Sequence, residues 1–205
     1  MQETEKPSIV IDKQVFLRAL DAHDEAVQYF RVNAHETIAK ITKAMLHCFE
    51  SGGKVLLAGN GGSAADCQHI AGELAGRFKL QRKPLPTISL SSDTSVITCI
   101  ANDFDYSTIF SRQVDAIGCK GDIFWALSTS GSSPNILTAI EMAKKKEMLT
   151  ISFTGKPGSL LEKKSSHCLC AHSGDTGHAQ EIHQLAYHII CRNIDSFYSE
   201  QSSRL

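Results

Sequence analysis

The chain has 205 residues, the size of one domain with a terminal extension. Its 21 Lys and Arg residues nearly balance its 22 Asp and Glu residues, and the formal net charge of −1 excludes a basic nucleic-acid-binding protein and an acidic disordered tail. No apolar run approaches the ~20 residues that span a bilayer, and the N-terminus shows no secretory signal. We therefore expect a cytoplasmic protein without nucleic-acid or membrane partners.

Seven cysteines are scattered along the chain, and none forms a Cys-x-x-Cys pair. An odd, irregularly spaced set is typical of reduced thiols in a reducing compartment. Most of them stand in apolar stretches, so we expect most to be buried.

The N-terminal part of the chain predicts two helices, because apolar residues recur at helical spacing over 15–32 and 36–50. Residues 1–12 show no clear period. We divide the chain into an N-terminal helical extension, 1–33, and a single domain, 34–200. The extension is a candidate for oligomer contacts, although a terminal helix that packs on its own domain gives the same pattern.

Beyond residue 53, short apolar runs alternate with helical patterns. The expected strands are 54–58, 86–90, 122–127, 149–153 and 166–171. The expected helices are 64–78, 93–101, 107–117, 135–146, 157–163 and a long last one over 178–198. This alternation is typical of an α/β fold in which helices cover both faces of a five-stranded parallel sheet.

Two loops at the carboxyl ends of expected strands are rich in glycine or hydroxyl groups. Gly59-Asn60-Gly61-Gly62-Ser63 precedes a helix, and so does Ser128-Thr129-Ser130-Gly131-Ser132-Ser133-Pro134. Glycines admit a ligand close to the backbone, and helix N-termini attract anions. Neither loop matches the dinucleotide or Walker fingerprint. An ordinary turn and an ordinary helix cap are the alternatives, but two such loops on one sheet edge favour a phosphorylated small molecule.

Histidines and carboxylates form a second pattern. His69 and Glu73 share one face of an expected helix, which suits a divalent metal or a surface ion pair. The last helix adds Gln180, Glu181, His183 and His188. Glu181 aligns better with His188 than Gln180 does, and spacing alone does not settle which side chains converge. We interpret His167, His172 and His178 as incidental polar residues.

These segments carry a resemblance to a known family. Asn60-Gly61-Gly62-Ser63 with His69 and Glu73, together with Ser128-Thr129-Ser130-Gly131, resembles the sugar isomerase (SIS) family. Residues 57–73 and 101–113 are more closely similar to its bacterial phosphoheptose isomerases. The resemblance implies a doubly wound, flavodoxin-like sandwich and a homotetramer with active sites near subunit interfaces. It also implies conversion of sedoheptulose 7-phosphate to D-glycero-D-manno-heptose 7-phosphate through an enediol, the first step of nucleotide-activated heptose biosynthesis.

The resemblance also implies roles for individual residues. Glu73 would be the catalytic base and His188 the acid. One Zn²⁺ per subunit would be held by His69, Glu73, Gln180 and His188, with His183 as a supporting candidate. Substrate would contact Asn60, Gly61, Gly62, Ser63, Glu73, Asn102, Asp103, Ser128, Thr129, Ser130, Ser133 and Gln180. A metal-bound carboxylate is a weakened base, so we expect the bond to Glu73 to be long or exchangeable.

One segment departs from the family pattern. The family usually has Asp-Thr-Pro-Arg-Ile before the glutamine, whereas this chain has Asp175-Thr176-Gly177-His178-Ala179. The departure affects contacts at the mouth of the site and removes no expected ligand. The alternative function is a non-catalytic SIS protein that binds the replication initiator DnaA or senses a sugar phosphate. Retention of the proposed base and ligands favours the enzyme.

Overall fold

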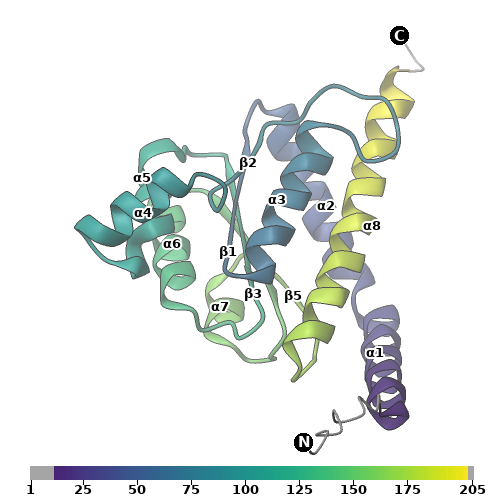
Figure 1. Cartoon of the computed structure of the whole chain (residues 1–205). Coiled ribbons are helices and arrows are strands. Elements are labelled where there is room, and N and C mark those ends of the chain that lie inside the picture. The colour runs from purple at the N-terminus through teal and green to yellow at the C-terminus, as the bar shows by residue number, and fades with distance from the viewer. Residues whose placement is uncertain (1–11, 203–205) are drawn as a thin grey trace, which may run out of the picture.

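The computed structural model describes residues 12–202, so nearly all of the expected lead-in, 1–12, lies outside the described residues (Figure 1). The elements in chain order are α1 Lys13–Asn33, α2 His35–Glu50, β1 Val55–Gly59, α3 Gly62–Ala75, β2 Thr87–Ser89, α4 Thr94–Asp103, η1 Tyr106–Thr108, α5 Ile109–Ile117, β3 Ile123–Ser128, α6 Pro134–Lys145, β4 Leu149–Thr154, α7 Leu160–Lys164, β5 His167–Cys170 and α8 Thr176–Ser202. None of these helices is long and apolar enough to cross a membrane.

The five strands form one parallel sheet in the order β2-β1-β3-β4-β5. β1 and β3 lie side by side, with Val55 opposite Ile123 and Gly59 opposite Leu127. From β1 the chain crosses to β2 on one side and afterwards to β3 on the other. This reversal is the topological switch point at which doubly wound sheets bind ligands. The expected flavodoxin-like α/β fold is confirmed.

Helices cover both faces of the sheet (Figure 1). Alternate strand residues divide between the two faces: Val55 and Leu57 pack with α2, α3 and α8. Leu56 and Ala58 pack with α4, α5, α6 and α7. Because both faces are buried, the strands have continuous apolar runs rather than an alternating pattern, which is how the sequence predicted them.

The expected elements are all present, but the helix expected over 64–78 ends at Ala75. The chain then runs without regular structure to β2.

The expectation that most of the cysteines are buried was wrong. All seven are free, as expected, but only Cys48, Cys67 and Cys191 are buried. Cys99 and Cys119 are exposed, because their helical or loop positions turn them away from the sheet.

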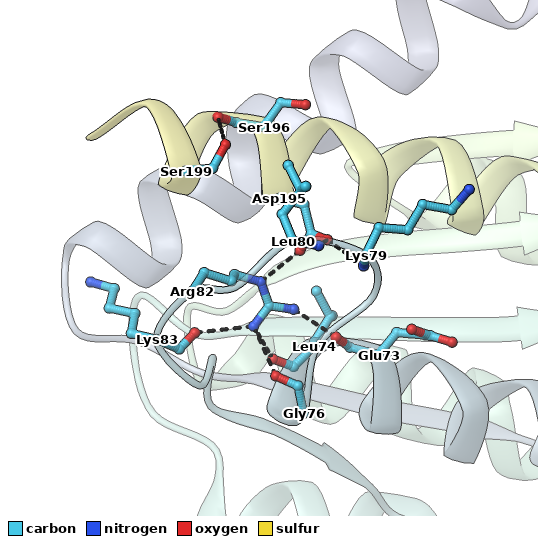
Figure 2. Close-up of polar contacts among 10 residues, drawn as sticks. All are labelled: Glu73, Leu74, Gly76, Lys79, Leu80, Arg82, Lys83, Asp195, Ser196 and Ser199. Atoms are coloured by element: carbon cyan, nitrogen blue, oxygen red, sulfur yellow. Dashed lines mark hydrogen bonds and ion pairs between the residues drawn. The ribbon is translucent and has the colours of Figure 1, made fainter. Parts of the chain in front are cut away.

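A buried ion pair fixes the segment between α3 and β2 (Figure 2). Arg82 Nε donates to Asp195 Oδ1 of α8 over 2.8 Å, and both side chains are 1% exposed. The other Asp195 oxygen accepts the N–H groups of Lys79 and Leu80, at 2.7 and 2.9 Å. The guanidinium also donates to the carbonyls of Glu73, Leu74, Gly76 and Lys83. The pair therefore joins the end of α3 to α8.

Removing the carboxylate should be costly. Asp195→Ala leaves a buried guanidinium without its counter-ion, a change that typically costs about 3–5 kcal/mol of unfolding free energy. We expect a large drop in the urea midpoint, measured by circular dichroism at one fixed protein concentration. The matched control is Glu147→Ala, which removes the exposed pair with Lys120. Equal midpoints for the two variants would show that the buried pair does not hold α3 to α8.

Candidate functional site

A cavity of about 260 Å³ lies at the switch point, between the loops that follow β1 and β3. Its lining residues come from these loops, from the starts of α3 and α6, and from the first turns of α8. They are Asn60, Gly61, Gly62, Ser63, Leu127, Ser128, Thr129, Ser130, Ser133, Thr176 and Gln180. Nine of the twelve residues expected to contact substrate line this cavity: Asn60, Gly61, Gly62, Ser63, Ser128, Thr129, Ser130, Ser133 and Gln180. The other three, Glu73, Asn102 and Asp103, do not.

Steric constraints explain why positions 61 and 62 of the first loop are glycine. Gly61 has φ +55°, in the region that favours glycine. A Cβ on Gly62 would lie 2.7 Å from Nε2 of Gln180, so an alanine there would displace the glutamine amide. Gly62 thus allows α8 to place Gln180 directly over the start of α3.

The second loop gathers hydroxyl groups. Ser128 Oγ lies 3.2 Å from Ser133 Oγ and 3.4 Å from Ser130 Oγ. No charged side chain lines the cavity as the structure describes it. An anion in this cavity would therefore be held by hydroxyls, backbone N–H groups and helix dipoles.

Two helices that start at the cavity, α3 and α6, lack side-chain caps, as do α2 and α5 elsewhere in the fold. Side chains of Asp12, Asp93 and Ser159 cap α1, α4 and α7. In contrast, α3 and α6 start at Gly61 and Ser133 with no side-chain cap hydrogen bond. Their first N–H groups, unlike those of the capped helices, remain available for a bound anion.

Asn60 is held in place by a pair of amide hydrogen bonds. Its Nδ2 donates to Asn135 Oδ1 over 3.0 Å, and Asn135 Nδ2 donates back to Asn60 Oδ1 over 2.9 Å. The Tyr106 hydroxyl donates to the same Asn60 oxygen over 3.2 Å. The contacts join the loop after β1 to η1 and to the first turn of α6. Neither Asn135 nor Tyr106 was among the expected site residues.

His69, Glu73 and His188 form a second group of side chains, which we call the HEH cluster. Nε2 of His69 lies 3.0 Å from Oε1 of Glu73. The rings of His69 and His188 meet edge to face, with centroids 5.2 Å apart. Ligand atoms of all three lie within 4.8 Å of one another. The structure thus brings together three of the four residues expected to hold a metal.

Tyr187 orients the His69 ring from behind. Its hydroxyl lies 2.9 Å from His69 Nδ1 and donates to Asp66 Oδ1 over 3.3 Å. Because the hydroxyl donates its hydrogen bond to Asp66, its oxygen can accept one from the His69 tautomer that carries Nδ1–H. Nε2 then carries a lone pair and faces the Glu73 carboxylate. Two acceptors so close need a cation or a proton between them, and imidazole with carboxylate is a donor set that suits Zn²⁺.

The His188 imidazole is enclosed by aromatic rings. It stacks on Phe78, with centroids 5.3 Å apart, and meets Tyr187 at 4.7 Å. Burial, followed by the neighbouring His69, lowers the pKa of His188 below its ordinary value. His188 is therefore neutral at pH 7, the form that binds a metal or donates one N–H to a substrate oxygen.

Gln180 is the expected ligand that lies apart from the HEH cluster. Its amide packs on Gly62 at the cavity, whereas His188 lies eight positions further along α8, about 12 Å of helical rise.

Asn102 and Asp103 are exposed at the end of α4 and do not line the described cavity. Asn102 Nδ2 donates to Asp103 Oδ1 over 2.8 Å.

His183 does not support the HEH cluster within the described chain. It is fully buried, and Nε2 lies 3.1 Å from the carbonyl oxygen of Thr154 in β4. Its ring packs against Phe153. Burial lowers its pKa to about 4, so the imidazole is a neutral core group.

Comparisons with known proteins identify the family. The SIS domain matches residues 20–155, which carry both cavity loops and α3. Phosphoheptose isomerase 1 of Campylobacter jejuni is 45% identical over 161 residues, 78% of this chain and 87% of that protein. The phosphoheptose isomerase of Helicobacter pylori is 42% identical over 88% of this chain and 94% of its own length.

A solved structure agrees with these relatives. A phosphoheptose isomerase from Francisella tularensis superposes with a TM-score of 0.85 at 34% identity, covering 91% of this chain and all of that one. At these coverages the likeness extends beyond residue 155, where the SIS match ends. The chain therefore belongs to the SIS family and, within it, to the phosphoheptose isomerases.

Proposed function

We propose that this protein converts sedoheptulose 7-phosphate to D-glycero-D-manno-heptose 7-phosphate, the aldose–ketose step that opens nucleotide-activated heptose biosynthesis. The HEH cluster is the observation that carries the proposal, because it brings a carboxylate and two imidazoles together on α3 and α8, the helices whose first turns line a cavity suited to phosphate. A protein that only sensed a sugar phosphate or bound DnaA would need the cavity but not this cluster. The seven free cysteines fit a cytoplasmic location.

The phosphate group occupies the cavity in this proposal. The hydroxyls of Ser128, Ser130 and Ser133 and the uncapped N-termini of α3 and α6 supply its hydrogen bonds. Asn60 and Gln180 at the rim contact the sugar hydroxyls. Because these donors carry little net charge, the cavity holds a phosphate without arginine or lysine.

Glu73 moves the proton between C1 and C2. Its Oε1 faces His69, and Oε2 has no hydrogen bond among the described residues, so Oε2 is available to take a proton. Glu73 removes a proton from C1 of the ketose while His188 donates to O2, giving the enediol. Glu73 then returns the proton to C2, and His188, which gave its proton to O2, takes the O1 proton, which gives the aldehyde. Proton transfer of this kind requires a base within reach of the carbons and an acid within reach of the oxygens.

A zinc ion would be held by His69, Glu73 and His188. The family resemblance also implies Gln180, which in this chain lies apart from these three residues at Gly62. When bound, the ion would polarise the substrate oxygens and stabilise the negative charge of the enediolate. The neutral state of His188 and the lone pair on His69 Nε2 both favour metal binding.

Replacing the base tests the reaction. Glu73→Gln keeps the shape of the side chain but removes its basicity, and we expect turnover to fall by about 10²–10⁴-fold. Aldose formation from sedoheptulose 7-phosphate is followed by NMR, with exposed Glu36→Gln on α2 as the matched control. The proposal fails if folded, zinc-loaded wild-type protein gives no aldose, or if Glu73→Gln turns over at the wild-type rate.

Zinc removal tests the metal. Chelation followed by desalting should abolish turnover, and one equivalent of Zn²⁺ should restore it, because the enediolate charge is otherwise uncompensated. Elemental analysis of the same samples verifies the metal content. Full activity in protein shown to be metal-free would contradict a catalytic zinc.

A homotetramer is the assembly we propose, with α1 as an interface element. Along α1 only Ala26 is buried, whereas Phe16, Leu17 and Leu20 are 60%, 37% and 48% exposed on one side of the helix. An apolar face of this size on a helix is typical of a surface that a second subunit covers. α1 therefore packs on its own α8 through Ala26 and presents its outer face to a neighbour.

Charge placed on the outer face of α1 should break the assembly. We expect Phe16→Glu with Leu20→Glu to lower the mass measured by light scattering, because two carboxylates would be buried at the interface. Arg18→Glu is the control, since it also changes the net charge by −2 but removes no apolar surface. An unchanged mass for the double variant would place the interface elsewhere.

A further inference from the structure

A second group of metal-binding side chains lies away from the HEH cluster. His23 of α1 and His178 and Glu181 of α8 have ligand atoms within 4.8 Å of one another. His178 and His188 are ten positions apart on α8, about 15 Å of helical rise. The two groups are therefore separate, and the phosphate cavity and isomerase chemistry do not use the second one.

The donor atoms of this second group converge on one carboxylate oxygen. Nδ1 of His23 lies 2.7 Å from Oε2 of Glu181, and Nδ1 of His178 lies 3.0 Å from the same oxygen. Ligands at the Zn–N and Zn–O distances of about 2.0–2.1 Å are separated by about 3.3 Å in a tetrahedron, close to these spacings. Small side-chain rotations would let all three atoms bind one ion.

The type and setting of the donors also suit zinc. Two imidazoles and one carboxylate form a three-ligand set that zinc uses in proteins, with a fourth position left for water. His178 is only 17% exposed, and it borders a cavity of about 430 Å³ between α1 and the segment before α8. The cavity can supply the water ligand, and His23 at 41% exposure leaves a path for the ion.

The backbone holds His178 in position for this role. The Asp175 carboxylate accepts the N–H groups of Gly177 and His178, at 2.7 and 3.1 Å, which fixes the first turn of α8. His178 then reaches Glu181 across one turn. An ordinary ion pair would need one imidazole, whereas here two imidazoles from different helices meet one carboxylate.

We propose that His23, His178 and Glu181 bind a second Zn²⁺ that fastens α1 to the first turns of α8. Glu181 follows Gln180 directly, so an ion here also restrains the residue that packs on Gly62 at the phosphate cavity. In this proposal His178 is a ligand rather than the incidental polar residue that we expected from the sequence.

Zinc stoichiometry tests the proposal on the full-length protein. Each purified variant is loaded with Zn²⁺, desalted and measured by elemental analysis. We expect two equivalents per chain for wild type and for His47→Ala, whose histidine is exposed on α2. We expect one equivalent for His178→Ala, one for His69→Ala and none for the double variant. Wild type and His178→Ala with equal zinc content would overturn the second site.

Hydrogen exchange distinguishes zinc binding at this second site from the isomerase activity. Zinc should slow amide exchange in α1 in wild type and in His69→Ala, but not in His178→Ala, because only the second site touches α1. Exchange in α1 that zinc leaves unchanged would contradict the proposal even where turnover is normal. A protein that binds the second zinc but shows no turnover would instead contradict the isomerase function alone.

Discussion

The Arg82–Asp195 pair is the contact on which the geometry of the site depends (Figure 2). Arg82 binds the Glu73 carbonyl over 2.6 Å, which fixes the end of α3 at the residue that carries the proposed base. Asp195 lies seven positions after His188, almost two full turns, so both point from the same face of α8. The pair therefore sets the register of α3 against α8, and with it the meeting of Glu73 and His188.

The register requires an ion pair rather than apolar packing. Taking two charges out of water is expensive, and the cost is recovered only when every donor and acceptor is satisfied. Asp195 accepts three hydrogen bonds, and the guanidinium donates to four carbonyls besides. Such a network is satisfied in one arrangement only, whereas apolar side chains on α3 and α8 could slide by a fraction of a turn. Positional accuracy, more than stability, is what the pair adds.

The sequence predicted what depends on local pattern. Apolar runs located the strands, and Gly61 with Pro134 marked the two helix starts at the cavity. The missed features depend on residues far apart in the chain, such as the Asn60–Asn135 amides, Tyr187 behind His69, and Arg82 against Asp195. Spacing left open whether Gln180 or Glu181 joins His188, and the described chain places neither in the HEH cluster. The contact between His23 and Glu181 joins residues 158 positions apart and was likewise not predicted.

The near-neutral charge of the chain agrees with the separation between the proposed phosphate cavity and the HEH cluster. Gly62, His69 and Glu73 lie on one face of α3, and from Gly62 to His69 is about 10 Å of rise. Helix dipoles and hydroxyls act at the phosphate end, and ionisable groups act only at the far end. A phosphate held by lysine or arginine would place a positive charge along the same face and would compete with a metal for Glu73. In the proposed mechanism, uncharged phosphate binding would therefore leave the Glu73 carboxylate free for the proposed cation and for the proton of the isomerisation.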